Sequence, residues 1–175
     1  MTAPEPSKNT AQREPEVSPE MAAKLASGQI TLAQFVGLSR EQLYAMANIA
    51  YNLLNSGKLE DARDIYRGLV AADPFDSVFH CHLAAVYLRM GDAQAALKEF
   101  NLALRFNVAN VDAMAGRGET HLQLGQLSEA VTDLRSALEL DPKLSRASTI
   151  RARAILLSLK DAMNKYKSGE TTSAS

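Results

Sequence analysis

Tryptophan is missing from the 175-residue sequence, cysteine occurs once, and aromatic residues make up only 6%. A single cysteine cannot form a disulfide within the chain, so the fold does not depend on an oxidising compartment. Neither sign of charge prevails, because 19 basic residues stand against 20 acidic ones. This balance argues against a nucleic-acid-binding protein with a basic surface, and we expect no nucleic-acid partner.

Long apolar runs are also missing. The longest strictly apolar run, Leu83 to Leu88, is far shorter than the roughly 20 residues that cross a bilayer. The first ten residues lack the apolar stretch of a secretory signal. We therefore expect a cytoplasmic protein without stable membrane association.

Alanine is abundant, with 28 residues in 175, and this composition favours close-packed helices over sheets. Residues 1–17 hold three of the six prolines and residues 168–175 are small and polar, so we expect both to be disordered tails. After the first tail, Ser18-Pro19-Glu20 is typical of a helix start, and Thr31 to Gln34 and Ser39 to Gln42 match the capping-box pattern. Residues 18–42 are predicted to form an N-terminal helical extension.

A period of 34 residues organises the middle of the chain, where glycine recurs at Gly57, Gly91 and Gly125. Two further columns keep the same intervals: Ala62, Ala96 and Ala130, and Leu54, Leu88 and Leu122. Because glycine permits a turn that a side chain would obstruct, the columns predict three helical hairpins, at 43–76, 77–110 and 111–144. Small residues mark the expected helix crossings: Ala50, Ala84 and Gly118 on the first helices, and the alanine column on the second helices.

The unit length and these small and bulky positions resemble the tetratricopeptide repeat (TPR), over 102 of the 175 residues. The resemblance implies an all-α fold, a TPR-type α-solenoid. Val108 takes the place of the proline that usually ends a unit, and we expect the second unit to run into the third without a sharp break. Arg117 and His121 occupy positions where large apolar side chains are usual, so the third hairpin is expected to pack differently.

A solenoid needs a cap, and residues 145–167 are predicted to form a C-terminal capping helix. Ile150, Ala154, Leu157 and Met163 keep helical spacing in it. Its six basic residues accompany one acid, Asp161; they are Arg146, Arg151, Arg153, Lys160, Lys165 and Lys167. A nucleic-acid or acidic partner is one interpretation, and a solvated outer face is the one we favour because the whole chain is nearly neutral.

Motifs of catalysis and metal binding are missing: the sequence has no CxxC, HExxH, acid-rich calcium loop, phosphate loop or GxSxG. His80 and His82 lie two residues apart, so their side chains point in different directions on a helix. We interpret them and His121 as packed or solvated, and Cys81 as a buried small residue. The sequence thus predicts no enzyme, no metal site and no cofactor, and an enzyme or metal protein using His80, His82 or Cys81 ranks last among the hypotheses.

In the TPR family, fixed positions of the first helices face a concave groove. The resemblance therefore implies a partner-binding surface of small, aromatic and polar side chains. Mapped onto this chain, its predicted members are Tyr44, Ala47, Tyr51, Leu54, Asn55, Val78, Cys81, Ala85, Leu88, Arg89 and Leu122. Such a surface suits a few apolar side chains of a peptide. Each leucine fits equally well as a core residue.

A narrower resemblance rests on SGKLEDARDIYRGLVAADPFDSVFH, across the first two units, and on LRMG before the second turn. These stretches resemble the class II chaperones of bacterial type III secretion. The resemblance implies a cytoplasmic chaperone that binds an extended segment of hydrophobic translocator proteins in its groove and keeps them soluble for export. It also implies a homodimer through the N-terminal stretch from Pro19 to Val36.

The alternative is a general TPR scaffold that assembles another protein complex. One such role, capture of acidic chaperone C-termini by a carboxylate clamp of Lys, Asn and Arg, is disfavoured. The clamp positions hold Ala47, Tyr51, His82, Asp112 and Gly116, and the carboxylate of Asp112 would repel that of the ligand.

Overall fold

The computed structural model describes residues 18–168, and every regular element among them is an α-helix. The tails predicted at 1–17 and 168–175 lie outside these residues, except that Ser168 ends the last helix. The helices are α1 (Pro19–Ala26), α2 (Leu32–Phe35), α3 (Arg40–Asn55), α4 (Leu59–Ala72), α5 (Ser77–Arg89), α6 (Ala93–Phe106), α7 (Val111–Gln123), α8 (Leu127–Leu140) and α9 (Ala147–Ser168). The all-α class predicted from the sequence is confirmed.

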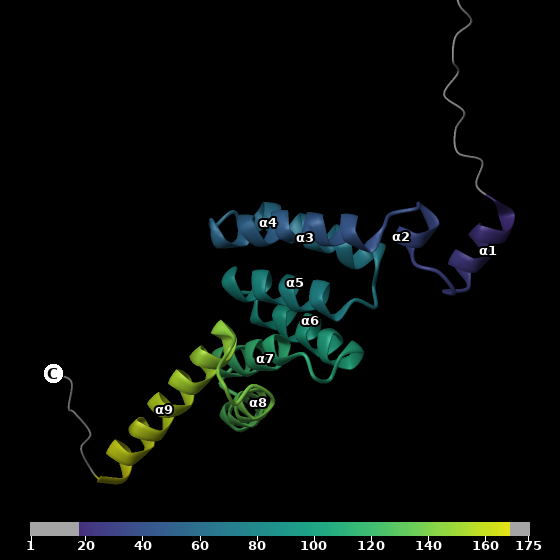
Figure 1. The fold of residues 1–175 in the computed structure, drawn as a ribbon. Helices are drawn as coiled ribbons and strands as arrows, with labels where there is room; N and C mark the ends of the chain where they lie inside the picture. Colours follow the sequence, from purple (N-terminus) through teal and green to yellow (C-terminus); the bar gives the residue numbers. More distant parts are fainter. Residues whose placement is uncertain (1–17, 169–175) are drawn as a thin grey trace, which may run out of the picture.

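Three hairpins, α3–α4, α5–α6 and α7–α8, stack one below the other (Figure 1). The glycine that joins the two helices of each hairpin has a positive φ: +81° at Gly57, +83° at Gly91 and +73° at Gly125. Each second helix also packs on the first helix of the following hairpin. The first helices touch one another in order, α3 to α5 to α7 to α9, and form one layer of the solenoid.

The small residues lie at the helix crossings, as predicted. Ala50 and Ala62 in the first hairpin are fully buried, as are Ala84 and Ala96 in the second. In the third hairpin, a Cβ added to Gly118 would lie 2.8 Å from Cγ of Leu134. Any side chain at this position would force α7 and α8 apart.

The chain breaks sharply between the second and third units, so the expectation based on Val108 was wrong. Helix α6 ends at Phe106, and α7 begins at Val111. The Asn107 side chain accepts a hydrogen bond of 3.1 Å from the Ala109 amide, and the Asn110 side chain caps α7 with one of 3.0 Å from Ala113. Two asparagine side chains thus supply the turn that proline supplies elsewhere.

Polar contacts accompany the apolar packing in the third hairpin. Arg117 donates through Nε and one terminal nitrogen to the two carboxylate oxygens of Asp133, at 2.7 and 2.8 Å. Asp133 is only 7% exposed. His121 lies beside the same carboxylate, at 3.7 Å, and hydrogen bonds to Gln126. The two unusual side chains found in the sequence therefore belong to one ion-pair network that joins α7 to α8.

The two ends of the stack differ. Helix α1 contacts only α2 and buries no side chain, and it lies apart from the hairpins in Figure 1. The carboxylate of Asp141, which follows α8, accepts hydrogen bonds from Thr149, Ser145 and Arg146 at the start of α9, and these bonds lower its pKa to about 2. The first half of α9 packs on α7 and α8, and the second half extends away from them. None of the helices within residues 18–168 is long and apolar enough to cross a membrane.

Candidate functional site: the concave groove

A cavity of about 580 Å³ lies on the layer of first helices, and we call it the groove cavity. Helices α3, α5, α6, α7 and α9 supply its wall. The lining residues are Tyr51, Leu54, Asn55, Cys81, His82, Ala85, Leu88, Arg89, Phe100, Asp112, Gly116, Glu119, Arg146, Ala147, Ser148 and Arg151. All three hairpins and the C-terminal helix therefore contribute to one site.

The side of the cavity formed by α3 and α5 is largely apolar, with Asn55 and Arg89 as strongly polar members. Tyr51 presents a ring that is 46% exposed, and Leu54 and Leu88 lie beside it. The floor is Phe100, which comes from α6 and is 1% exposed. Its ring lies so close to Gly116 that a Cβ there would collide with it. Glycine on α7 is what allows an aromatic floor to form between the first helices.

Two titratable side chains in this apolar part are held neutral. His82 stacks on Tyr66, with the two ring centroids 5.4 Å apart, and it meets Tyr51 edge to face at 5.7 Å. Burial lowers the pKa of His82, so the imidazole is uncharged at neutral pH. Burial also raises the pKa of Cys81 to about 12, which keeps it a thiol. At these two positions the groove cavity thus presents a neutral imidazole and a thiol rather than a thiolate.

The side formed by α7 and α9 is charged and internally paired. Arg146 lies 2.6 Å from a carboxylate oxygen of Asp112, and the Ser148 hydroxyl donates to the other oxygen at 2.5 Å. One turn further on, Arg151 lies 3.1 Å from Glu119. These two ion pairs fix the start of α9 against α7 and close one side of the groove cavity.

Seven of the eleven predicted partner-binding residues line the groove cavity: Tyr51, Leu54, Asn55, Cys81, Ala85, Leu88 and Arg89. Two others, Ala47 and Leu122, line neither this cavity nor a second one at the edge of the stack. Ala47 is buried in the first hairpin, where its carbonyl accepts a 3.0 Å hydrogen bond from Tyr66, and Leu122 packs in the core of the third hairpin. Asp112, which the sequence places at a clamp position, also lines the cavity, and so does Glu119.

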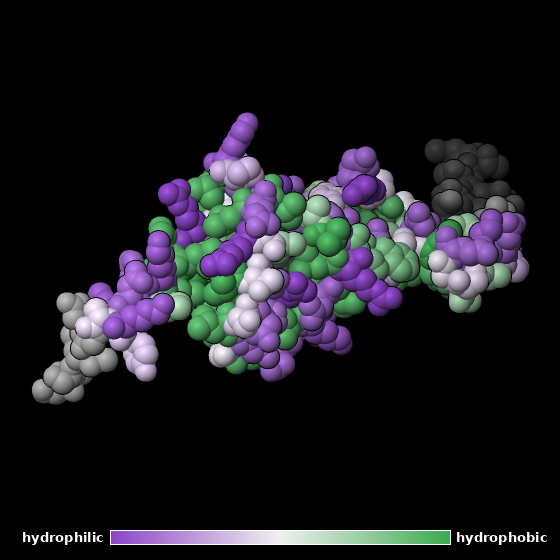
Figure 2. All heavy atoms as spheres, turned by 90° about the horizontal axis from the view of Figure 1, so that it is seen from below, coloured by the Kyte–Doolittle hydropathy of each residue, from purple (hydrophilic) through white to green (hydrophobic). Residues whose placement is uncertain are grey.

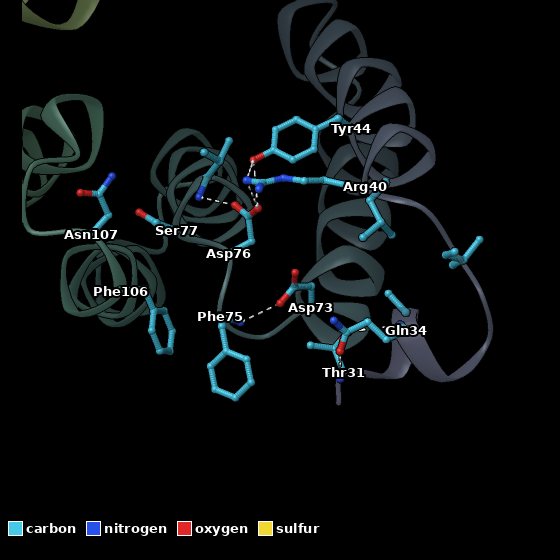
Figure 3. A pocket seen from close by; sticks show the side chains of 14 residues that line it. Thr31, Gln34, Arg40, Tyr44, Asp73, Phe75, Asp76, Ser77, Phe106 and Asn107 are labelled. Atoms are coloured by element: carbon cyan, nitrogen blue, oxygen red, sulfur yellow. Dashed lines mark hydrogen bonds and ion pairs between the residues drawn. The ribbon is translucent and has the colours of Figure 1, made fainter. Parts of the chain in front are cut away.

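The other two, Tyr44 and Val78, line a second cavity of about 530 Å³ at the edge of the stack (Figure 3). Here the Tyr44 hydroxyl donates to Asp76 at 2.9 Å, and Arg40 approaches the same carboxylate at 3.7 Å. Asp76 also caps α5. The polar groups of this edge cavity are therefore bonded to one another, and they hold α3 against the start of α5.

Sequence reasoning missed the contributions of Phe100 and of the start of α9. Phe100 reads as an ordinary core residue of a second helix, and only the glycine at 116 signals that its ring reaches the groove. The arginines of α9 were noticed as basic residues, but their partners on α7 lie more than thirty positions away in sequence. No local sequence pattern connects Arg146 with Asp112 or Arg151 with Glu119.

Histidine and cysteine side chains do not form a metal site within residues 18–168, where no group of three or more possible ligands converges. His80 faces Glu99 with Nδ1, at 2.7 Å, and the Pro74 carbonyl with Nε2, at 2.9 Å. Burial works against the charged form, but the bonds to Glu99 and Pro74 outweigh it and raise the pKa of His80. Both ring nitrogens therefore serve the fold, tying α5 to α6 and to the connection before α5.

Comparison with known families agrees with this architecture. The tetratricopeptide repeat model matches residues 81–145. The chain belongs to the tetratricopeptide-repeat family. The model of the bacterial transcriptional activator domain matches residues 19–106, half of this TPR protein, which therefore belongs to that family as well. The two models overlap at residues 81–106, which comprise most of the second hairpin.

Among curated proteins, Low calcium response locus protein H of Yersinia pseudotuberculosis is 29% identical over 133 residues, which are 74% of this TPR protein and 79% of that one. Human DnaJ homolog subfamily C member 3 is 28% identical over 127 residues, and the match spans only 25% of its length. The part shared with the DnaJ homolog is thus a repeat segment of a much larger protein.

Two solved structures share the fold closely. The type III secretion translocator chaperone SycD of Yersinia enterocolitica has a TM-score of 0.65 and 26% identity, and the match covers 74% of this chain and 98% of that one. PcrH in complex with the chaperone binding region of PopB has a TM-score of 0.61 and 28% identity, with 67% and 97% covered. Nearly the whole of each chaperone therefore corresponds to helices of this TPR protein.

Proposed function

We propose that this TPR protein is a cytoplasmic, non-enzymatic chaperone that binds an extended apolar segment of type III secretion translocator proteins in the groove cavity. The observation that carries the proposal is the match to SycD and PcrH. Both are translocator chaperones matched over nearly their whole length, and PcrH is complexed with the chaperone binding region of PopB.

The groove cavity has the chemistry that such a segment requires. Apolar side chains of an extended peptide can insert between Tyr51, Leu54 and Leu88, over the floor formed by Phe100. The aromatic ring of Tyr51 offers a large contact area with a polar tip. The ion pairs of Asp112 and Glu119 lie at one side, and Arg89 on the other side donates a 3.0 Å hydrogen bond to the Leu54 carbonyl.

A chaperone of this kind shields apolar segments until export. A groove that engages a short segment through a few anchors binds tightly enough to prevent aggregation, and each anchor contributes a limited free energy, so that release needs no nucleotide. We further propose that α1, which buries none of its side chains in the stack, takes part in a homodimer. A structure described as an alternative dimer of SycD makes self-association a property to test here.

Co-expression with the hydrophobic translocators of the same organism tests the proposal. The wild-type chain should keep a translocator soluble and copurify with it. The double variant Tyr51→Glu/Leu88→Glu should lose the complex, because it places two charges in the apolar part of the groove cavity. Circular dichroism should show unchanged helicity.

The matched control is Leu127→Glu/Leu140→Glu. These leucines are 49% and 48% exposed and lie on α8, away from the groove cavity, so this variant should bind as the wild type does. An insoluble, unbound translocator beside a folded wild-type chain would refute the chaperone function. Loss of the complex in both double variants would refute the assignment of the groove.

The second candidate is a TPR scaffold for another complex, and the match to the bacterial transcriptional activator domain favours a regulatory one. Capture of an acidic C-terminus remains the weaker form of this alternative. Arg146 neutralises Asp112, so repulsion is smaller than the sequence indicated, but Ala47 is buried and Gly116 is covered by Phe100. Tight binding of a regulator in place of any translocator, abolished by Tyr51→Glu/Leu88→Glu, would favour the scaffold.

A further inference from the structure

Helix α9 stands where the first helix of a fourth hairpin would stand. It packs on α7 and α8 in the way that α7 packs on α5 and α6. It has 22 residues, whereas α7 has 13, and its additional length projects beyond the stack (Figure 1). Ala152 is buried in the first half, but every residue from Lys160 to Ser168 is exposed. Among the described residues, nothing packs on α9 in the place that α8 takes on α7.

The apolar face of α9 continues past the point where the stack ends. Leu156 and Leu159 are partly buried, and Met163 and Tyr166, one and two turns further on, are 55% and 80% exposed. We call these four residues the α9 seam. Their spacing of three, four and three residues is that of the a and d positions of a heptad repeat, so they form one stripe along the helix. A stripe of this kind is suited to a second helix laid alongside.

One border of the seam is uniformly basic. Arg153, Lys160 and Lys167 follow one another at seven-residue intervals, at the position next to each d residue, and we call them the basic flank. All three are exposed, and within residues 18–168 none of them forms an ion pair. By contrast, Arg146 and Arg151 at the start of the same helix are both paired with α7. Figure 2 shows polar side chains projecting around this end of the molecule.

We propose that the α9 seam and its basic flank bind, in trans, an amphipathic helix of a partner protein whose corresponding flank is acidic. The partner helix would take the place that the second helix of a fourth hairpin has in the solenoid. This surface is separate from the groove cavity, and it requires a different ligand: a helix with alternating apolar and acidic positions rather than an extended apolar segment.

Charge decides against a second copy of α9 as the occupant. In an antiparallel pair the two basic flanks would face each other, and like charges at these positions are destabilising. In a parallel pair each flank would face Ile155 and Ala162, which carry no charge, and the single acid Asp161 lies on the opposite side of the helix. Only a partner with acidic side chains pairs with the flank in either direction.

The full-length protein should be titrated with two synthetic helical peptides that carry leucine at the a and d positions. One peptide has glutamate and the other lysine at the flanking positions, and fluorescence anisotropy measures binding at low and high salt. The glutamate peptide should bind roughly tenfold more tightly, because three exposed charge pairs together amount to about one power of ten in affinity. High salt should reduce this difference.

Variants identify the surface. Arg153→Glu/Lys160→Glu/Lys167→Glu should reverse the preference between the two peptides, and Met163→Asp/Tyr166→Asp should abolish binding of both. The matched control is Ile150→Asp/Leu157→Asp, because these residues are 55% and 52% exposed on α9 but lie off the seam, and it should bind as the wild type does. Circular dichroism of each variant verifies that α9 remains helical.

Four outcomes would overturn the proposal: equal affinity for the two peptides, loss of binding in the control variant, self-association that Met163→Asp/Tyr166→Asp removes, or a short DNA duplex bound more tightly than the glutamate peptide. The second and third would place the contact elsewhere or make it a contact between copies. The groove variant Tyr51→Glu/Leu88→Glu should still bind the glutamate peptide. A failed peptide titration would therefore leave the translocator-binding proposal intact. A failed co-expression experiment would likewise leave the proposal for the α9 seam intact.

Discussion

In the first hairpin, α3 and α4 meet through apolar contacts around the fully buried ring of Tyr66. In the third hairpin, Leu134 packs on Gly118 at the crossing, and the ion pair of Arg117 with Asp133 joins α7 to α8 beside this apolar contact. Both hairpins keep small residues at their crossings, Ala50 with Ala62 and Gly118 with Ala130. The comparison shows that the repeat fixes how closely the helices approach and leaves open which chemistry fills the space beside the crossing.

The two solutions respond differently to truncation. An apolar contact is lost in proportion to the surface and volume removed. An ion pair with little exposure depends on both partners, because removing one leaves the other charge poorly solvated, while replacing both with apolar residues removes the cost of burying charge. The free energy of unfolding should therefore fall most where a fully buried aromatic side chain is removed.

Tyr66→Ala should destabilise the first hairpin most, by about 3–5 kcal/mol, as is usual when a buried aromatic side chain is removed. The side chain is fully buried, and its hydroxyl donates a 3.0 Å hydrogen bond to the Ala47 carbonyl. Urea unfolding followed by circular dichroism measures the loss. Tyr66→Phe separates the two contributions and should cost about 1 kcal/mol for the lost hydrogen bond. Equal losses in the two variants would show that ring packing contributes little.

Asp133→Ala should destabilise the third hairpin by about 2–3 kcal/mol, since it leaves Arg117 unpaired at a site with limited exposure. The side chains of Arg117 and Asp133 are 26% and 10% exposed, so water solvates the remaining guanidinium only in part. The double variant Arg117→Met/Asp133→Leu should recover most of the stability. If the double variant is as unstable as Asp133→Ala, the network stabilises the hairpin by more than charge compensation.

His80→Gln tests the second hairpin, which combines both solutions, and should cost about 1–2 kcal/mol at pH 6 through the loss of hydrogen bonds to a charged group. Because the folded protein raises the pKa of His80 above 6.5, its stabilising contribution is full below the unfolded pKa and is lost as the pH rises through the folded one.

The difference in unfolding free energy between wild type and His80→Gln should therefore shrink from pH 6 to pH 9. His82, whose pKa burial lowers, is present in both proteins and cancels from the difference. Glu99→Gln should show the same pH trend, because Glu99 is the charged partner of His80. A difference that stays constant with pH would mean that folding does not shift the pKa of His80, and a difference that grows with pH would mean that His80 is neutral in the folded protein.

The sequence predicted those parts of the fold that depend on residues close to one another in the chain. The capping boxes at Thr31 and Ser39 form as expected, with the glutamine side chains accepting from the cap amides at 2.8 Å. The prediction based on Val108, that the second unit runs into the third without a sharp break, was wrong because proline is only one way to end a unit. Asn107 and Asn110 end this one through their side-chain hydrogen bonds. A turn can thus be specified by side-chain hydrogen bonds where the usual residue is absent.

The groove was predictable in part. Seven of the predicted residues on α3 and α5 line it, whereas Tyr44 and Val78 on the same helices line the edge cavity. Ala47 and Leu122 did not follow, because each lies at the border of the helix face and packs inward once the neighbouring helix is in place. Groove positions carried over from the TPR resemblance thus hold for most residues of the first two units, and the packing of neighbouring helices decides the rest.

By itself, the sequence determined the helices, their turns and their closest crossings, because caps, turn glycines and small-residue columns act within a single hairpin. Only the tertiary structure decided that α9 closes the groove. Arg146 pairs with Asp112 across 34 positions and Arg151 with Glu119 across 32, and these partners meet only after the hairpins have stacked. The same stacking buries Ser148, Thr149 and Ala152 in the first half of α9, and it leaves Met163 and Tyr166 of the seam uncovered because the second half extends beyond the stack.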